Sequence, residues 1–314
     1  MYGQFIVIFA LLITGFVMRK KKIIDGNMNV SLNKMLLYVA IPCLIIHKIG
    51  NIVMEGDLLR DFLLAFAIFY AVQLVFSVYT YGYTKARKFP KGRGVVAELC
   101  MTAPNSGFMG FPIALIFFGE LGLVLMIAAN MAMNLYLFTY GIVRMEMSRE
   151  SEKMKLGSLL REVGKNLVNP ITISILAGFA VCLAHITIPA PVNEFLLLIA
   201  NLCTPLSMIY IGSALCEQDI VGLLKDRMVL ETGVNKLIMF PLFVLAAVYF
   251  LPIDPLVKAI CVLSASMPTA AVTPILAGEK GHDEVFGGET VVTSTAFSAI
   301  TIFIFVQVIN ALLV

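Results

Sequence analysis

The fold of this chain is decided by the stretch APNSGFMGFPI, residues 103–113, which interrupts an otherwise apolar segment. A second stretch, MPTAAVTPI at residues 267–275, repeats its features: a proline, then polar and small residues, then a second proline and an isoleucine. A Gly-Glu pair follows each stretch, at 119–120 and 278–279. Because a proline removes one helical hydrogen bond and clashes with the preceding turn, each stretch predicts a broken helix.

The composition indicates that these broken helices lie in a lipid bilayer. Of the 314 residues, 60% are apolar and only 14% are charged, and the mean hydropathy is +0.93. Soluble domains contain about 45 to 50% apolar residues on a similar count. A cytosolic enzyme, a disordered chain and a nucleic-acid-binding protein are therefore poor fits, and an integral membrane protein is predicted.

The apolar stretches are numerous enough for ten transmembrane helices, since each crossing needs about 20 apolar residues. The basic segment near the middle leaves five spans on either side, which predicts a first repeat at residues 1–143, a cytoplasmic linker at 144–165 and a second repeat at 166–314. An odd number of spans per half predicts that the repeats are inverted. The predicted spans are 4–18, 32–51, 59–83, 95–118, 122–143, 166–186, 193–215, 228–250, 256–277 and 290–313.

The distribution of basic residues predicts how the chain is oriented. Nineteen of the 23 Lys and Arg residues fall in segments that ten crossings would place on one side, beginning with the run RKKK at 19–22. Cytoplasmic loops carry such an excess of Lys and Arg. We therefore expect a multi-pass protein of the plasma membrane with both the N-terminus and the C-terminus outside.

The depth of the first proline in each stretch points to a binding site. At about 1.5 Å per residue, Pro104 lies roughly 14 Å and Pro268 roughly 18 Å into their spans, near the middle of a core about 30 Å thick. Non-helical backbone at that depth is tolerated only inside protein or along a wet cavity. The helix that follows each break presents unpaired N–H groups and about half a positive charge, which favours an anion.

Neutral polar residues accompany both breaks and the helix between them. Asn130 and Asn134 are four residues apart, so they share one face of the fifth span. Polar residues at this depth should face protein or water, and they could belong to the site or hold helices together. The predicted substrate-binding residues are Pro104, Asn105, Ser106, Asn130, Asn134, Pro268, Thr269 and Thr273.

Lys236 is the most deeply placed charge, about 12 Å into the eighth span. A charged residue inside a membrane span is a functional hypothesis by default, so a role with the substrate or with a coupling ion is one interpretation. Pairing with Glu231 or Asn235, or extension of the side chain toward the interface, are the others.

The sequence offers little for metal binding or catalysis. Its six cysteines are isolated, and no C-x-x-C pair or Cys/His cluster occurs, so no metal and no cofactor are predicted. Residues 104–107 faintly resemble the Gly-x-Ser-Gly of intramembrane serine proteases. A serine nucleophile needs a nearby base, and His47 and His185 are predicted near span ends, so no enzyme is predicted.

In these residues the chain resembles the auxin efflux carrier family, which includes the plant PIN-formed auxin exporters and bacterial malonate or malate transporter homologues. The family pattern Pro-Asn-Thr-x-x-Met-Gly-Ile-Pro is similar to residues 104–112, and its second proline pattern is similar to 268–277. Residues 41–44 and 236–241 resemble further family segments. The resemblance spans the whole chain.

The resemblance implies a ten-helix carrier of inverted repeats, related in fold to the bile-acid sodium symporters. Helices four and nine would cross at their prolines in a transport domain that moves, as an elevator, against a scaffold of helices one, two, six and seven. Homodimers through the scaffold are implied. The family's Asp and Lys in helix three have no counterpart at residues 69–75, where Gln73 is the only strongly polar residue, so the coupling ion, H+ or Na+, stays open.

The sequence thus predicts a secondary active or facilitative transporter of small organic anions, chiefly carboxylates, with its site at the crossover of helices four and nine. Its expected partners are the organic anion, the lipid bilayer and a second copy of the chain, with no nucleic acid. A channel, or a membrane-embedded sensor for a small ligand, is the alternative.

Overall fold

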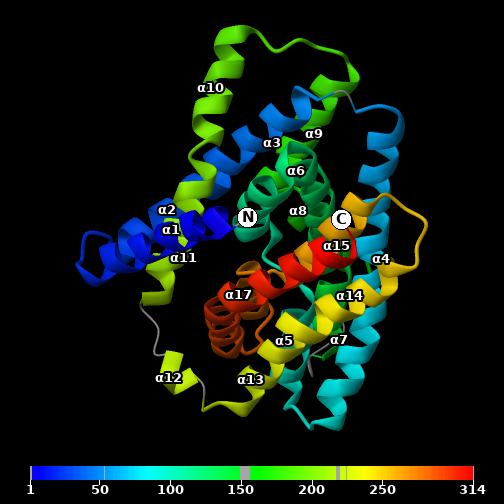
Figure 1. The fold of residues 1–314 in the computed structure, drawn as a ribbon. Coiled ribbons are helices and arrows are strands. Elements are labelled where there is room, and N and C mark those ends of the chain that lie inside the picture. Colours follow the sequence, from blue (N-terminus) through cyan, green and yellow to red (C-terminus); the bar gives the residue numbers. More distant parts are fainter. Residues whose placement is uncertain (1, 53, 149–155, 217–219, 224, 314) are drawn as a thin grey trace. The chain divides into compact units, whose positions relative to one another are not determined.

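The computed structural model describes residues 2–52, 54–148, 156–216, 220–223 and 225–313 (Figure 1). Among these residues all regular secondary structure is helical, and one isolated β-bridge joins Pro104 to Thr269. The helices of the first half are α1 (Tyr2–Lys20), α2 (Gly26–Met35), η1 (Leu36–Ala40), α3 (Ile41–Gly50), α4 (Gly56–Ala86), α5 (Lys91–Thr102), η2 (Ser106–Gly110), α6 (Phe111–Tyr136), η3 (Leu137–Gly141) and α7 (Ile142–Ser148).

The second half continues with α8 (Leu156–Leu167), α9 (Pro170–Leu183), α10 (Ala190–Ala200), α11 (Cys203–Cys216), α12 (Ile220–Leu223), α13 (Arg227–Val234), η4 (Asn235–Met239), α14 (Phe240–Tyr249), α15 (Pro255–Ser266), α16 (Val272–Glu279) and α17 (Glu284–Leu312). Each of the ten predicted apolar stretches coincides with helical segments. Of the predicted linker 144–165, residues 149–155 lie outside the described residues.

Six helical runs among the described residues are long and apolar enough to cross a membrane, and α9 and α15 are shorter apolar helices. These runs support a polytopic membrane protein, while the number of ten crossings and the inversion of the halves stay predictions. The six runs are Gly26–Gly50, Gly56–Ala86, Ser106–Ser148, Ala190–Cys216, Arg227–Tyr249 and Glu284–Leu312.

Prolines account for η1 and η4, two of the four π-helical turns in the part of the chain that the structure describes. Pro42 and Pro241 each lack an N–H, so the carbonyl one turn earlier loses its usual donor. The residue before each proline instead bonds five residues back, from Ile41 to Leu36 and from Phe240 to Asn235. Single π turns inside helices are frequent at functional sites because they change the direction of the side chains around them.

The chain divides into two compact units, and each takes segments from both sequence halves. Unit 1 contains Met1–Phe62, Gly107–Ile127 and Val168–Gln218, whereas unit 2 contains Leu63–Ser106, Ala128–Leu167 and Asp219–Val314. The predicted repeats, 1–143 and 166–314, are therefore not the compact units. Their inverted relationship concerns internal symmetry and stays a prediction.

In unit 1, α1 packs against α11 through glycines that let the two backbones meet. A Cβ atom added at Gly15 would lie 2.1 Å from the carbonyl oxygen of Ile209, and one added at Gly212 would lie 2.0 Å from that of Leu12. Small residues allow this close approach of helices in membranes. The contact is reciprocal, because each helix places a glycine against the backbone of the other.

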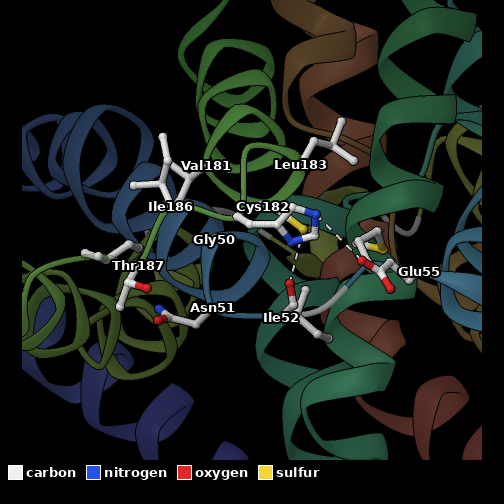
Figure 2. A pocket seen from close by; sticks show the side chains of 12 residues that line it. Gly50, Asn51, Ile52, Glu55, Val181, Cys182, Leu183, Ile186 and Thr187 are labelled. Atoms are coloured by element: carbon white, nitrogen blue, oxygen red, sulfur yellow. Dashed lines mark hydrogen bonds and ion pairs between the residues drawn. The ribbon is translucent and has the colours of Figure 1, made fainter.

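Unit 1 also contains a pocket of about 300 Å³ where α3 and α9 end (Figure 2). Cys182 Sγ donates to the carbonyl oxygen of Ile52 at 3.1 Å, and His185 Nε2 lies 3.8 Å from Glu55 Oε1, beyond hydrogen-bond distance. Asn51 Nδ2 donates to Asn193 Oδ1 at 2.7 Å. The pocket contains none of the sequence-predicted site residues.

In unit 2, ion pairs gather near the basic segments that the sequence predicts to be cytoplasmic. Arg93 bonds to Asp226 at 3.2 Å and to Asp283 at 2.7 Å, and Lys280 bonds to Glu146 at 3.0 Å. Partial burial by itself would raise the pKa of Asp283, but the N–H of Phe286 and the Arg93 guanidinium hold that pKa below its usual value. These pairs link α5 to the starts of α13 and α17, and the end of α16 to α7.

Candidate functional site

Both proline stretches interrupt their helices as the sequence predicts. The helix α5 ends at Thr102 and α15 ends at Ser266, and the residue that follows each end, Ala103 or Met267, has extended backbone angles. A proline disfavours the helical conformation of the residue before it. Pro104 and Pro268 thus set where the two helices stop.

The two breaks lie against each other within unit 2. The N–H of Asn105 donates to the carbonyl oxygen of Pro268 at 2.7 Å, and the N–H of Ala270 donates to that of Ala103 at 2.9 Å. These bonds form a short antiparallel bridge between Pro104 and Thr269. Because backbone N–H and C=O groups freed by a break must find partners in a membrane protein, each stretch supplies the partners of the other.

Thr269 fixes the second break to its surroundings through both its backbone and its side chain. Its hydroxyl donates to the carbonyl oxygen of Cys100 on α5 at 2.9 Å, and its N–H donates to Ser294 Oγ on α17 at 3.1 Å. All three residues are buried. The bridge therefore has a defined position relative to α5 and α17.

Thr269→Val is expected to lower the stability of the protein, because Val keeps the shape but leaves the Cys100 carbonyl without its hydroxyl donor. An unsatisfied buried polar group costs about 1–3 kcal/mol. Thermal unfolding in detergent measures the effect. The matched control is Thr295→Val, which also replaces a threonine hydroxyl that donates to a backbone carbonyl. That bond joins Thr295 to Val291 within α17, at a half-buried position, so its loss should cost less. Equal melting temperatures for the two variants would contradict the anchoring role of Thr269.

The predicted asparagines of the fifth span reach the first break. Asn130 Nδ2 donates to Ser106 Oγ at 2.9 Å, and Asn134 Nδ2 donates to Asn130 Oδ1 at 3.0 Å. Asn130 and Ser106 are buried, and Asn134 is half-buried. The sequence left open a site role or a role in holding helices together, and the structure shows a chain of amides that ends on the break itself.

Thr273 lies in the first turn of α16, after the second break. Its side chain is fully buried, and its Oγ1 has no hydrogen-bond partner among the described residues. Leaving a buried hydroxyl unsatisfied costs free energy unless a ligand or water fills the position. Thr273 is therefore a group that a bound substrate could satisfy.

Lys236, in the π-helical turn η4, has a partner that the sequence did not predict. Its side chain is fully buried, so it does not extend to the interface, and Nζ donates to the carbonyl oxygen of Ala265 at 2.7 Å. The ammonium also lies 4.7 Å from the centroid of the Phe240 ring. The two predicted local partners are engaged elsewhere, Glu231 with Arg87 and Arg227 and Asn235 with Tyr79.

A cavity of about 210 Å³ lies next to this region, between α13 and η4 on one side and α17 on the other. It is lined mainly by apolar side chains, and it reaches Ser294, the residue that accepts the N–H of Thr269. Among the described residues, no cluster of three or more His, Cys, Asp or Glu side chains is placed to hold a metal ion.

Gln73, on α4, belongs to the region although the sequence gave it no role. It is fully buried, and its Nε2 lies 3.5 Å from the carbonyl oxygen of Thr102, the last residue of α5. A signal was present in the sequence, because Gln73 precedes Pro104 by 31 residues and Lys236 precedes Pro268 by 32. Ser294 carried no such signal, since Ser and Thr are frequent along α17.

Comparisons with known proteins show which proteins this chain is similar to. Residues 1–306 match a family described as "Membrane transport protein". The chain is 23% identical over 296 residues to an "Uncharacterized transporter" of Methanothermobacter thermautotrophicus, covering 94% of each. It is 24% identical over 305 residues to an "Uncharacterized transporter" of Methanocaldococcus jannaschii, covering 95% of each. It is also 23% identical over 312 residues to a "Putative malonate transporter" of Rhizobium meliloti, covering 96% of this chain and 93% of that protein.

Proposed function

The chain belongs to the membrane transport protein family, that of the auxin efflux carriers, and from this premise we propose that it is a carrier of small organic anions, chiefly carboxylates. The observation that carries the proposal is the pair of broken helices bonded to each other, with Asn105 bonded to Pro268 and Ala270 bonded to Ala103. Such paired breaks bring the ends of half-helices together, and transporters commonly bind their substrates at such ends.

The groups around the breaks suit a carboxylate. The start of α16 carries a partial positive charge, and Thr273 adds a buried hydroxyl without a partner among the described residues. The amides of Asn130 and Asn134 add neutral hydrogen-bonding groups. Lys236 adds a positive charge at Ala265, three residues before Pro268. One relative's name, "Putative malonate transporter", supports a dicarboxylate as the first substrate to test.

The division into units supports an elevator mechanism for this carrier. All nine site residues, Lys236 included, belong to unit 2, whereas unit 1 contains the first, second, sixth and seventh predicted spans. In our proposal unit 2 carries the substrate and unit 1 is the scaffold, through which two copies form a dimer in the plasma membrane. Rigid-body movement of one part of a transporter against another produces alternating access.

Ligand-dependent melting in detergent tests the proposal. A ligand that binds only the folded state stabilises it by RT ln(1 + [L]/Kd), about 2.7 kcal/mol at a hundredfold excess over Kd. We expect a saturable rise in melting temperature with at least one mono- or dicarboxylate, and counterflow of that acid in proteoliposomes. Flux without saturation or counterflow would indicate a channel, and binding without flux would indicate a sensor.

Asn105→Ala is expected to abolish transport and the ligand-induced rise in melting temperature while the protein remains folded. Asn105 lies in the bridge between the breaks, and only 8% of its surface is exposed. Its backbone bond to Pro268 does not need the side chain, so the bridge should persist. In the control, Asn27→Ala removes an exposed amide on α2. Wild-type transport by Asn105→Ala would remove this residue from the site.

A further inference from the structure

The two helices that stop at the breaks, α5 and α15, end with buried polar side chains against their last carbonyl groups. Lys236 Nζ donates to the carbonyl oxygen of Ala265 at 2.7 Å, one residue before α15 ends. Gln73 Nε2 lies 3.5 Å from that of Thr102, where α5 ends. The last four carbonyls of a helix lack intrahelical donors, and the helix end carries about half a negative charge.

Gln73 and Lys236 occupy corresponding places relative to the breaks. Each lies on the helix that precedes the broken helix, 31 residues before Pro104 and 32 before Pro268. Both face one aromatic cluster: the Lys236 ammonium lies over the Phe240 ring, whose centroid is 6.2 Å from that of Phe69 and 4.8 Å from that of Phe76. These two phenylalanines lie four residues before and three after Gln73, on the same face of α4.

The two caps differ in charge. A carboxamide donates a hydrogen bond to the end of α5 without a formal charge, whereas an ammonium brings a full positive charge to the end of α15. Among the described residues, no carboxylate forms a salt bridge with Lys236. A buried charge needs a counter-charge or strong hydrogen bonds, and the Ala265 carbonyl, the helix end and the Phe240 ring supply only part of that stabilisation.

We propose that Lys236 is the fixed counter-cation of the carboxylate site, and that Gln73 is its neutral counterpart, positioning the end of α5. The ends of broken helices are where transporters commonly bind coupling cations. In this chain the Lys236 ammonium instead occupies the end of α15. There it attracts a carboxylate bound where the two breaks cross. This inference rests on the proposed function and adds to it the residue that selects for negative charge.

The experiment compares binding of the best carboxylate from the melting series with binding of its neutral amide. For the wild-type protein we expect the acid to bind at least tenfold more tightly than the amide. Lys236→Gln keeps a donor for Ala265 but removes the charge, so it should bind the acid at least tenfold more weakly while binding of the amide changes little. The control is Lys258→Gln, which removes a lysine near the start of α15 whose Nζ donates to the carbonyl oxygen of Tyr249 at 3.2 Å. This variant should bind both ligands as the wild type does.

The double variant Gln73→Lys with Lys236→Gln moves the charge to the corresponding place on α4. It should bind the acid at least threefold more tightly than Lys236→Gln alone. Equal affinity of wild type for acid and amide would overturn the inference, even where the lysine variants fail to fold. Unchanged acid binding by Lys236→Gln would also overturn it and leave Lys236 as a cap alone. If wild type binds no carboxylate at all, the proposed function itself fails, which is a different result.

Discussion

Gly212→Ala is expected to lower the melting temperature of the protein by roughly 6 to 12 °C, since overpacking at this position costs about 3 kcal/mol. A methyl group at this position would lie 2.0 Å from the carbonyl oxygen of Leu12, and its nearest neighbours are backbone atoms that cannot rotate away. The helices α1 and α11 would have to separate along their whole contact. Gly15→Ala, whose methyl group would meet Ile209 at 2.1 Å, should have a similar effect.

Gly82→Ala is the matched control for both variants, because Gly82 also lies inside a long helix, α4, and an added Cβ would meet no atom within 4 Å. Alanine is the better helix former by about 1 kcal/mol, so this variant should be as stable as wild type or slightly more stable. Thermal unfolding followed by circular dichroism compares all three proteins. If Gly212→Ala has the same melting temperature as Gly82→Ala, α1 and α11 tolerate a wider spacing and the prediction is wrong.

Arg144→Met is expected to destabilise the protein by about 3–5 kcal/mol, because it leaves a buried carboxylate without its cation. Arg144 Nη2 lies 2.6 Å from Glu98 Oε2, and Thr84 donates to Glu98 Oε1 at 3.1 Å. Only 4% of the Glu98 surface is exposed. Thermal or denaturant unfolding in detergent measures the loss, and the double variant with Glu98→Gln should regain most of it, since no charge is then left buried.

An exposed arginine in another ion pair, Arg227, serves as the control for these variants. Arg227 is 78% exposed and pairs with Glu231, which keeps Arg87 when Arg227 is removed. Arg227→Met should therefore cost less than about 1 kcal/mol. If the double variant is no more stable than Arg144→Met alone, the cost arises from lost packing of the arginine against Tyr81 rather than from the unpaired carboxylate.

The sequence determined the class of the protein and where its helices break. Apolar composition and spacing fix the helical membrane architecture, because a bilayer leaves the backbone no other partners. The prolines fix the breaks because a missing N–H acts locally, whatever surrounds it. The shared helix face of Asn130 and Asn134 also follows from their spacing of four, and in the structure Asn130 on that face bonds to Ser106. Their role in substrate binding stays a prediction.

Tertiary structure alone decided which groups satisfy one another across those breaks. Nothing local in the sequence pairs Asn105 with Pro268, or Lys236 with Ala265, since these residues are brought together by helix packing. Lys236 shows the difference most clearly. Nearby Glu231 and Asn235 were reasonable partners by spacing, but the π-helical turn before Pro241 and the end of α15 gave the ammonium a buried carbonyl instead. Sequence spacing determines which side chains share a helix face, whereas the packing of distant helices determines what that face meets.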